Sequence, residues 1–265
     1  MPVTNSRTAV YSALVLRSRP SKSNTEVFLL TCEEGIINAT VYGGAKSKLR
    51  SHSAPYNSGQ VWIYRDPAKD YSKLSDFDVR FWRPGLRELY ERTMAAGSVA
   101  ETILASHGGG SDWETALELA TGTLDALENA NEELCARLSV HFLWRWAEFL
   151  GIQPDLEYCA ACENAAHAAC KNSGGEKILW FNTRENCIWC ADCFHETRIR
   201  ETSLNNQVLL QLNPGSRRWL AAVGRLEPSL LYRYSMDNKS FHEAKSLAAA
   251  VMTAALGKRL ASWDW

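Results

Sequence analysis

The stretch NTEVFLLTCEEGIINATVYGG, residues 24–44, is typical of two short β-strands joined by a tight turn at Glu34-Gly35. Both halves are rich in β-branched and aromatic residues, which favour strands. Outward from this stretch, residues 8–19, 59–66 and 75–82 have the same character. Five short strands within about 75 residues predict a small β-barrel of the OB type. The polar segment GGAKSKLRSHSAPYNSG between the third and fourth strands is expected to be a long loop.

From Pro84 onward the apolar pattern becomes helical. A stripe from Leu86 to Leu104 predicts one helix, and the sequence HGGGS ends it. Ser111, with a glutamate three residues on, forms a capping box for the next helix. Asn131 is expected to cap a third. After a cysteine-rich segment, the sequence predicts three more helical segments, at residues 204–212, 216–226 and 240–263.

The predicted fold class is therefore α+β and multidomain, with an OB-type β-barrel followed by a mainly α-helical domain that carries an inserted four-cysteine zinc lobe. We expect the barrel at residues 1–82, the helical domain at 83–155 and 201–265, and the lobe at 156–200. The sequence has no signal-peptide pattern and no apolar run of about 18 residues, so we expect no membrane contact. Eight cysteines then favour metal ligands and buried thiols in a reducing cytoplasm over disulfides.

The cysteines are arranged as pairs. Cys159 and Cys162 form one C-x-x-C, and the stretch ENCIWCADC holds Cys187, Cys190 and Cys193 at equal spacing. A tetrahedral zinc site needs four thiolates, and the residues alone allow either downstream pair to complete it. Four thiolates leave no open position for water, and no H-x-E occurs in the chain, so we expect a structural zinc.

Basic residues gather at two places in the predicted barrel. An OB barrel binds single strands through a basic groove that follows the phosphates and aromatic residues on which bases stack. The candidates for phosphate contact are Arg17, Arg19 and Lys22 near the first turn, and Lys46, Lys48 and Arg50 after the third strand. The second group alternates along one extended segment after two glycines, which let the backbone approach a phosphate closely. The alternative is a solvated loop without a ligand.

Aromatic residues and further arginines are weaker candidates. Possible stacking residues are Tyr42, Tyr56, Trp62 and Tyr64, although each is also a reasonable core or rim residue. A net charge of −1 hides a segregation, because residues 81–158 carry 5 Lys/Arg against 13 Asp/Glu. In the more basic C-terminal part, the arginines that would extend a DNA path are Arg198, Arg200, Arg217, Arg218 and Arg225.

The order of these parts resembles the RecO family of bacterial recombination mediators over nearly the whole length. The stretch YSALVLRSRPSKSNTEVFLLTCEEGIINATVYGGAKS is similar to the opening strands of that family. EFLGIQPDLEYCAAC is similar to its helix end and first cysteine pair, and LGKRLASW to its C-terminal helix. The chain departs from the family pattern in missing glycines and a longer insert within the lobe.

The resemblance implies a ligand set and a function. Asn186 and Cys187 take the positions of a small-residue pair that precedes the second C-x-x-C, which leaves Cys159, Cys162, Cys190 and Cys193 as ligands. The implied function is to bind single- and double-stranded DNA without sequence specificity and to anneal complementary strands. With the partner RecR, such a mediator helps to load RecA on DNA coated by single-strand-binding protein (SSB).

Further expectations follow from the same resemblance. The acidic tail of SSB implies an apolar pocket rimmed by cations from residues 198–259. A mediator of this kind is cytoplasmic and nucleoid-associated, takes no small-molecule substrate and is not an enzyme. The chain also shows no P-loop, nucleophile elbow or H-E-x-x-H. The alternative is an OB and zinc-ribbon adaptor of transcription or RNA metabolism, which has no reason to anneal strands.

Overall fold

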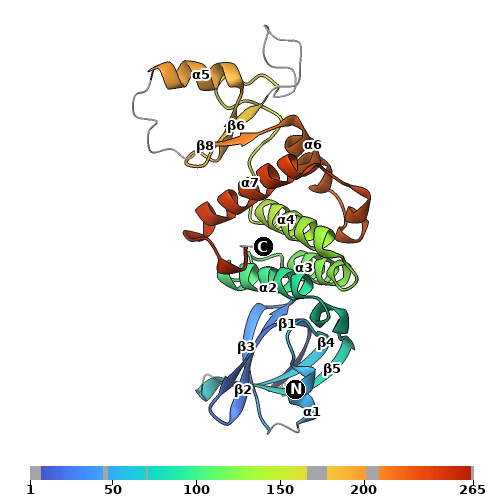
Figure 1. The fold of residues 1–265 in the computed structure, drawn as a ribbon. Helices are drawn as coiled ribbons and strands as arrows, with labels where there is room; N and C mark the ends of the chain where they lie inside the picture. Colours follow the sequence, from blue (N-terminus) through green and yellow to red (C-terminus); the bar gives the residue numbers. More distant parts are fainter. Residues whose placement is uncertain (1–6, 44–46, 70, 166–177, 201–208, 264–265) are drawn as a thin grey trace. The chain divides into compact units, whose positions relative to one another are not determined.

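The computed structural model describes residues 7–43, 47–69, 71–165, 178–200 and 209–263 (Figure 1). The chain divides into two compact units, Met1–Cys135 and Ala136–Asp264. The first unit holds a β-barrel and the helices that follow it. The second holds the cysteine cluster, a small sheet and the C-terminal helices.

A closed barrel of five strands opens the first unit, in the order β1-β2-β3-β5-β4. Its strands are β1 (Thr8–Ser21), β2 (Asn24–Thr31), β3 (Gly35–Val41), β4 (Ser58–Asp66) and β5 (Tyr71–Phe81). Neighbours are antiparallel, except that β3 meets β5 in parallel at Thr40 and Lys73. Closure of β1 against β4 completes an OB-type barrel, so the predicted fold of this region is confirmed.

The barrel core follows from the alternation of apolar and polar residues. On β2 and β3, Leu29 pairs with Ile37 and Val27 with Ala39, and all four side chains are buried. Successive residues of a strand point to opposite faces, so the residues between these buried ones face outward. Burial of a side chain the size of Val27, Leu29 or Ile37 stabilises the fold by about 1.5–3 kcal/mol.

The turn between β2 and β3 is tight, as predicted. Gly35 has a φ of 69°, and a Cβ atom there would lie 2.8 Å from the indole of Trp113. The Thr31 hydroxyl donates to the Gly35 carbonyl at 2.9 Å and accepts from the Glu34 amide at 3.2 Å. Glycine is therefore required both by the left-handed backbone and by the packing of the indole.

The segment between β3 and β4 is not a loop throughout. Residues Lys48–His52 form a short helix, α1, where the sequence predicts only loop. Leu49 packs against the barrel core, and the His52 Nδ1 donates to the carbonyl of Phe77 on β5 at 2.9 Å. Leu49 and the His52 hydrogen bond anchor this segment to the barrel, although its sequence is largely polar.

The helices of the first unit follow the barrel. A short 3-10 helix, η2 (Pro84–Arg87), precedes α2 (Tyr90–Ala105) and α3 (Trp113–Leu127). The next helix, α4 (Glu132–Phe149), begins in this unit and continues into the second. Asn131 caps α4 as predicted, since its Oδ1 accepts from the Leu134 amide at 2.9 Å. The capping box at Ser111 is wrong, because Asp112 is the cap of α3 and accepts from the Thr115 amide at 3.2 Å.

The second unit combines a three-stranded antiparallel sheet with helices. The sheet order is β7-β6-β8, formed by β6 (Leu179–Asn182), β7 (Cys187–Trp189) and β8 (Leu209–Leu212). The helical elements are α5 (Ala191–Arg200), α6 (Pro214–Val223), η4 (Pro228–Arg233), α7 (Asn238–Leu256) and η5 (Ala261–Trp263). The prediction of helices at 216–226 and 240–263 is thus confirmed in outline.

One predicted helix is wrong. Residues 209–212 form strand β8, although the sequence predicts a helix over 204–212. Leu212 and Leu210 pair with Leu179 and Phe181 of β6, and this long-range pairing overrides a weak local helical pattern. Among the described residues, no helix combines the length and apolar character needed to cross a bilayer.

Candidate metal centre and nucleic-acid interface

The two cysteine pairs lie on separate local structures. Cys159 and Cys162 occupy a turn that is closed by a bridge between Tyr158 and Ala165. Cys190 directly follows β7, and Cys193 lies in the first turn of α5. The β6–β7 hairpin brings the second pair against the first, and the Ala160 amide donates to the Ile188 carbonyl at 2.9 Å.

The four sulfurs are arranged around a common centre. The Sγ atoms of Cys159, Cys162, Cys190 and Cys193 all lie within 4.8 Å of one another, and those of Cys162 and Cys190 are 3.9 Å apart. Tetrahedral Zn–S bonds of about 2.3 Å place sulfurs about 3.8 Å apart. Four thiols in this arrangement therefore fit one metal ion and leave no open position.

Cys187 is not part of this group. It lies on β7 opposite Asn182, and its Sγ is 3.7 Å from a carboxylate oxygen of Glu185. Burial, followed by the nearby Glu185 charge, raises the pKa of Cys187 to about 11. Of the two downstream pairs that the sequence left open, the structure brings Cys190 and Cys193 to the first pair. Asn186, before it, has a φ of 52°, a left-handed conformation that glycine adopts more readily than other residues.

Backbone amides favour one thiolate in particular. Burial by itself would raise the pKa of Cys159, but amides of Cys190, Cys162 and Ala161 directed at its sulfur lower it to about 7. The Cys190 amide lies 3.2 Å from this Sγ. Burial raises the pKa of Cys190 to about 11 and also raises that of Cys193. Cys190 and Cys193 thus need a nearby cation to ionise, and a bound divalent metal would supply that charge.

A small aromatic cluster supports the cysteines. Trp180 of β6 stacks on Phe194 of α5 with ring centroids 4.1 Å apart and an interplanar angle of 14°. Trp189 is buried in the same cluster. Four soft thiolates in a closed arrangement match a structural site for zinc better than a site for a hard oxygen-binding cation.

The basic residues of β1 lie on the outside of the barrel. Arg17 and Arg19 are exposed, opposite Phe28 and Glu26 of β2. Arg19 forms an ion pair with Glu26 and lies over the Phe28 ring, so part of its charge is neutralised. Lys22 is exposed in the β1–β2 turn with a φ of 53°. These cations therefore border the β2–β3 face and its first loop, where OB folds bind oligonucleotides.

The second basic group has a different geometry from the predicted one. Lys48 and Arg50 belong to α1, so they do not project from an extended segment. Lys48 is exposed and Arg50 is half-buried, whereas Lys46 lies outside the described residues. A helix turns successive side chains by about 100°, so these two cations point in different directions.

The four aromatic candidates differ in exposure. Tyr42 is 46% exposed at the end of β3, and the Lys73 ammonium lies 5.6 Å from its ring centroid. Tyr56, Trp62 and Tyr64 are half-buried, and the Tyr64 hydroxyl accepts from Arg7 at 3.3 Å. Tyr42 is thus the one of the four with a largely open ring beside a cation.

Comparison with known proteins decides the family. A family model described as "Recombination protein O C terminal" matches residues 87–264, about two thirds of the chain. The chain belongs to the RecO family. A relative, the DNA repair protein RecO of Desulforamulus reducens, is 21% identical over 257 residues, which cover 96% of this chain and 91% of the relative. Membership of the RecO family gives the chain a role in DNA repair and recombination.

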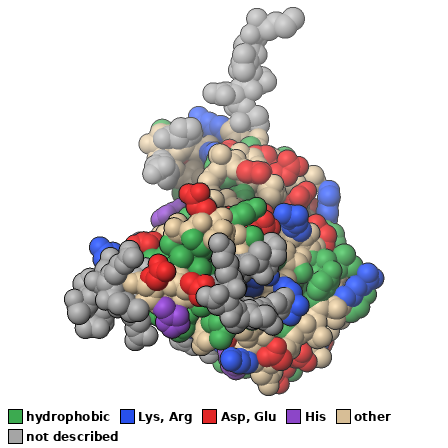
Figure 2. Space-filling model, turned by 90° about the horizontal axis from the view of Figure 1, so that it is seen from above, with side chains coloured by type: hydrophobic (Ala, Val, Ile, Leu, Met, Phe, Trp, Pro, Cys, Tyr) green, Lys and Arg blue, Asp and Glu red, His purple; other side chains and the backbone are tan. Residues whose placement is uncertain are grey.

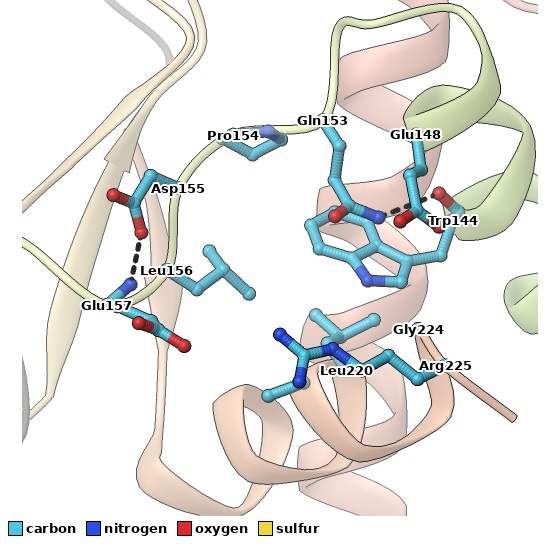
Figure 3. A pocket seen from close by; sticks show the side chains of 11 residues that line it. Trp144, Glu148, Gln153, Pro154, Asp155, Leu156, Glu157, Leu220, Gly224 and Arg225 are labelled. Carbon is cyan, nitrogen blue, oxygen red and sulfur yellow. Dashed lines mark hydrogen bonds between the residues drawn. The ribbon is translucent and has the colours of Figure 1, made fainter.

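One cavity of the second unit does not match the apolar, cation-rimmed pocket that the family resemblance implies. It has a volume of about 190 Å³ and lies in the second unit between the end of α4 and α6 (Figure 3). Trp144 and Leu220 give it an apolar wall, but Arg225 is its one cation against the carboxylates of Glu148, Asp155 and Glu157. An acidic peptide would be repelled by this rim.

The remaining C-terminal arginines are dispersed. Arg218 is exposed and Arg217 is half-buried on α6, while the side chains of Arg198 and Arg200 lie outside the described part. On the face drawn in Figure 2, basic and acidic side chains of described residues are intermixed. A nucleic-acid path therefore has to be sought in local groups of residues rather than in one broad basic field.

Sequence reasoning missed one feature of the barrel. Arg83, directly after β5, is 2% exposed and has a φ of 46°, while Trp82 before it is 45% exposed. The sequence FWRP contains no signal for a buried arginine. Its burial depends on a partner from a distant segment, Asp125 of α3, which lies 2.6 Å from its Nε.

Proposed function

We propose that this RecO-family chain is a recombination mediator that binds single- and double-stranded DNA without reading its sequence and anneals complementary strands. With RecR, it helps to load RecA on SSB-coated DNA during recombinational repair. The observation that carries the proposal is a closed OB-type barrel bearing exposed Arg17 and Lys22 beside its first loop, in a chain of the RecO family. OB folds bind oligonucleotides on that face.

The proposed mechanism is electrostatic and makes or breaks no bond. Arg17, Arg19 and Lys22 on the barrel, and Lys46, Lys48 and Arg50 after β3, contact phosphates and displace condensed counterions. The affinity for single strands should then fall with salt at a log–log slope of about −0.7 per phosphate contacted. Because two neutralised strands repel each other less, they can approach and pair on the protein surface.

The proposed division of labour follows the predicted domains. Residues 1–82 hold the DNA, residues 83–155 and 201–265 form the helical domain, and residues 156–200 form the metal lobe. Cys159, Cys162, Cys190 and Cys193 would hold a zinc ion that ties the two knuckles together. A zinc ion bound by four thiolates has no open coordination position for a substrate. Its proposed role is therefore to maintain the fold of the lobe.

The partners RecR and SSB are proposed from the family alone. The cavity of the second unit is a poor receptor for the acidic tail of SSB, because three carboxylates surround its single arginine. We therefore assign neither partner to a surface of this chain.

The decisive experiment is annealing of two complementary oligonucleotides that are coated beforehand with SSB. Pairing is followed by fluorescence with and without the protein, in the absence of any nucleotide. Acceleration without ATP supports the mediator. Intact nucleic-acid binding without acceleration would favour the alternative, an OB and zinc-ribbon adaptor of transcription or RNA metabolism.

A variant test addresses the proposed phosphate contacts. Lys46→Ala with Lys48→Ala and Arg50→Ala should weaken binding to single strands and flatten the salt slope, by about 0.7 for each lost contact. Lys239→Ala, which removes an exposed cation in the first turn of α7, is the matched control and should leave the slope unchanged. An unchanged slope in the triple variant would remove this segment from the DNA path.

A further inference from the structure

Two consecutive aromatic residues are exposed where β5 ends. Phe81 is 55% exposed and Trp82 is 45% exposed. We call this pair the β5-end platform. Neighbouring large aromatic residues at a surface indicate a binding site more strongly than isolated ones do. The platform is not part of the β2–β3 face, and none of the proposed phosphate or stacking contacts includes it.

The chain directly after the platform is held in an unusual conformation. Arg83 has a left-handed backbone, which only a surrounding structure that fixes it can maintain. Its buried guanidinium donates to Asp125 at 2.6 Å, to the Tyr56 carbonyl at 2.8 Å and to the Ser58 hydroxyl at 2.9 Å. The same group lies 5.5 Å from the ring centroid of Phe81. Arg83 therefore acts as a rigid support under the platform.

The second aromatic residue is held from the side. The rings of Trp82 and His52 meet edge to face, with centroids 5.1 Å apart and an interplanar angle of 90°. His52 is itself fixed, because its Nδ1 donates to the Phe77 carbonyl at 2.9 Å. Trp82 is thus oriented by a contact at its edge while nearly half of its surface stays open. A ring that is oriented in advance loses little conformational freedom when a ligand stacks on it.

Two basic residues lie near the residues of the platform, one on α1 and one on β5. Lys48 is four residues before His52 on α1, and residues at this spacing share one face of a helix. Arg80 is two residues before Trp82, in the β-bulge where β5 pairs with Ser58 and Gly59 of β4. Both cations are exposed, and neither forms an ion pair with another described residue.

Some of the acidic side chains near the platform are already paired with arginines. Asp125 is bound by Arg83, and Glu88 lies 3.8 Å from Arg92 on α2. Asp78, two residues before Arg80, is a further exposed carboxylate on β5. The surroundings of the platform therefore favour an anionic ligand with flat apolar faces, which is the chemistry of a single-stranded nucleic acid.

We propose that Trp82, with Phe81 beside it, is a stacking platform for bases of single-stranded nucleic acid, and that Lys48 and Arg80 contact the adjacent phosphates. This inference rests on the proposed function and deepens it, because it places a base contact outside the β2–β3 face. It also connects α1 to the DNA path through His52.

The test compares the full-length protein with Trp82→Ala by fluorescence anisotropy on a labelled oligothymidylate. Loss of one stacked base should weaken binding about ten-fold, while Trp82→Phe should stay within about three-fold of the wild type. Stacking releases no counterions, so the salt slope should not change in Trp82→Ala. By contrast, Lys48→Ala with Arg80→Ala should reduce the slope by about 1.4, corresponding to two phosphates.

Two controls separate stacking from other causes. An oligonucleotide of abasic sites carries the same phosphates without bases, so wild type and Trp82→Ala should bind it equally. This result also shows that the variant is folded. Tyr90→Ala removes the most exposed aromatic side chain of the first unit, at 72%, and should leave binding unchanged.

Several outcomes would overturn the inference. These are equal binding of oligothymidylate by Trp82→Ala and wild type, an equal loss on the abasic strand, or an equal loss in Tyr90→Ala. The inference is also overturned if Trp82→Ala leaves nucleic-acid binding unchanged and weakens only the binding of a partner protein. If the wild type anneals strands and Trp82→Ala binds oligothymidylate normally, only this inference is contradicted. If the wild type neither binds nor anneals DNA, the proposed function is contradicted as well.

Discussion

The barrel and the cysteine lobe hold themselves together in different ways. Twelve buried side chains, contributed by all five strands, form the core of the barrel. The corresponding cluster of the lobe has four, and two of them are Cys159 and Cys190. So small an apolar cluster cannot offset the entropy of ordering the chain, and domains of this kind depend on a metal or on disulfides. The barrel should therefore fold without help, and the lobe should need its metal.

The largest effect is expected from removing the metal. Structural zinc sites bind with an apparent free energy of about 10 kcal/mol or more, and in such sites the binding free energy is folding free energy. Chelation, or Cys159→Ser with Cys190→Ser, should abolish zinc binding and expose the lobe to limited proteolysis. The barrel should remain resistant. Zinc content measures metal binding, and the cleavage pattern shows whether the lobe and the barrel each remain folded.

Cys187→Ser is the matched control for the metal centre. It should keep one zinc per chain, because the Cys187 sulfur is not among the four that lie together. Cys193→Ser should lose the zinc. A reversed result for these two variants would assign the site to the other downstream pair. Cleavage of the barrel upon chelation would break the comparison between the two regions.

A third region, the helical core of the second unit, contains a buried titratable group. His141 is 0% exposed, and its Nε2 donates to the Leu226 carbonyl at 2.9 Å. Burial lowers the pKa of His141 to about 4 from its ordinary value of 6.5, so the folded protein favours the neutral ring. The associated stability is fully present above about pH 6.5 and is lost as the pH falls toward 4.

Denaturant unfolding at pH 7 and pH 5 measures this loss. The free energy of unfolding should fall by about 2 kcal/mol on account of His141. His141→Gln keeps a donor for the Leu226 carbonyl but does not titrate, so its pH dependence should be weaker by that amount. His242→Gln, which replaces an exposed histidine on α7, should retain the wild-type pH dependence. An unchanged dependence in His141→Gln would show that the buried ring does not contribute.

The smallest effect concerns the cap of α3 in the first unit. Asp112→Ala should destabilise the protein by about 1 kcal/mol, because the amide of Thr115 loses its acceptor. Ser111→Ala should change the free energy of unfolding by less than about 0.5 kcal/mol. Thermal unfolding of both variants measures the difference. An equal loss of stability in the two variants would support the capping box at Ser111 that the sequence predicts.

Much of the barrel could be predicted because its signals are local. The alternation that buries Val27 and Leu29 needs only the sequence of one strand, and the tight turn at Gly35 follows from the residue type. The elements that were predicted wrongly depend on distant partners instead. β8 exists because it pairs with β6, and α1 is anchored to the barrel by Leu49 and His52.

The candidate sites divide in the same way. The C-x-x-C spacing by itself indicates a metal knuckle, since two thiolates on one tight turn already form half of a site. Which further pair completes it depends on the β6–β7 hairpin, and the residues alone left that open. The exposed Trp82 gave no signal of its own, because its orientation depends on His52, from another segment, and on the buried Arg83 after it.

The sequence by itself determined the five strands, the cysteine knuckles, most of the helices and the resemblance to the RecO family, since periodicity and spacing act within a few residues. Only the tertiary structure decided that Cys193 rather than Cys187 joins the sulfur cluster, that Asp112 caps α3, and that Arg83 is buried beneath an open aromatic pair. Each of these depends on the side-chain directions that the folded backbone imposes, and no local pattern encodes them.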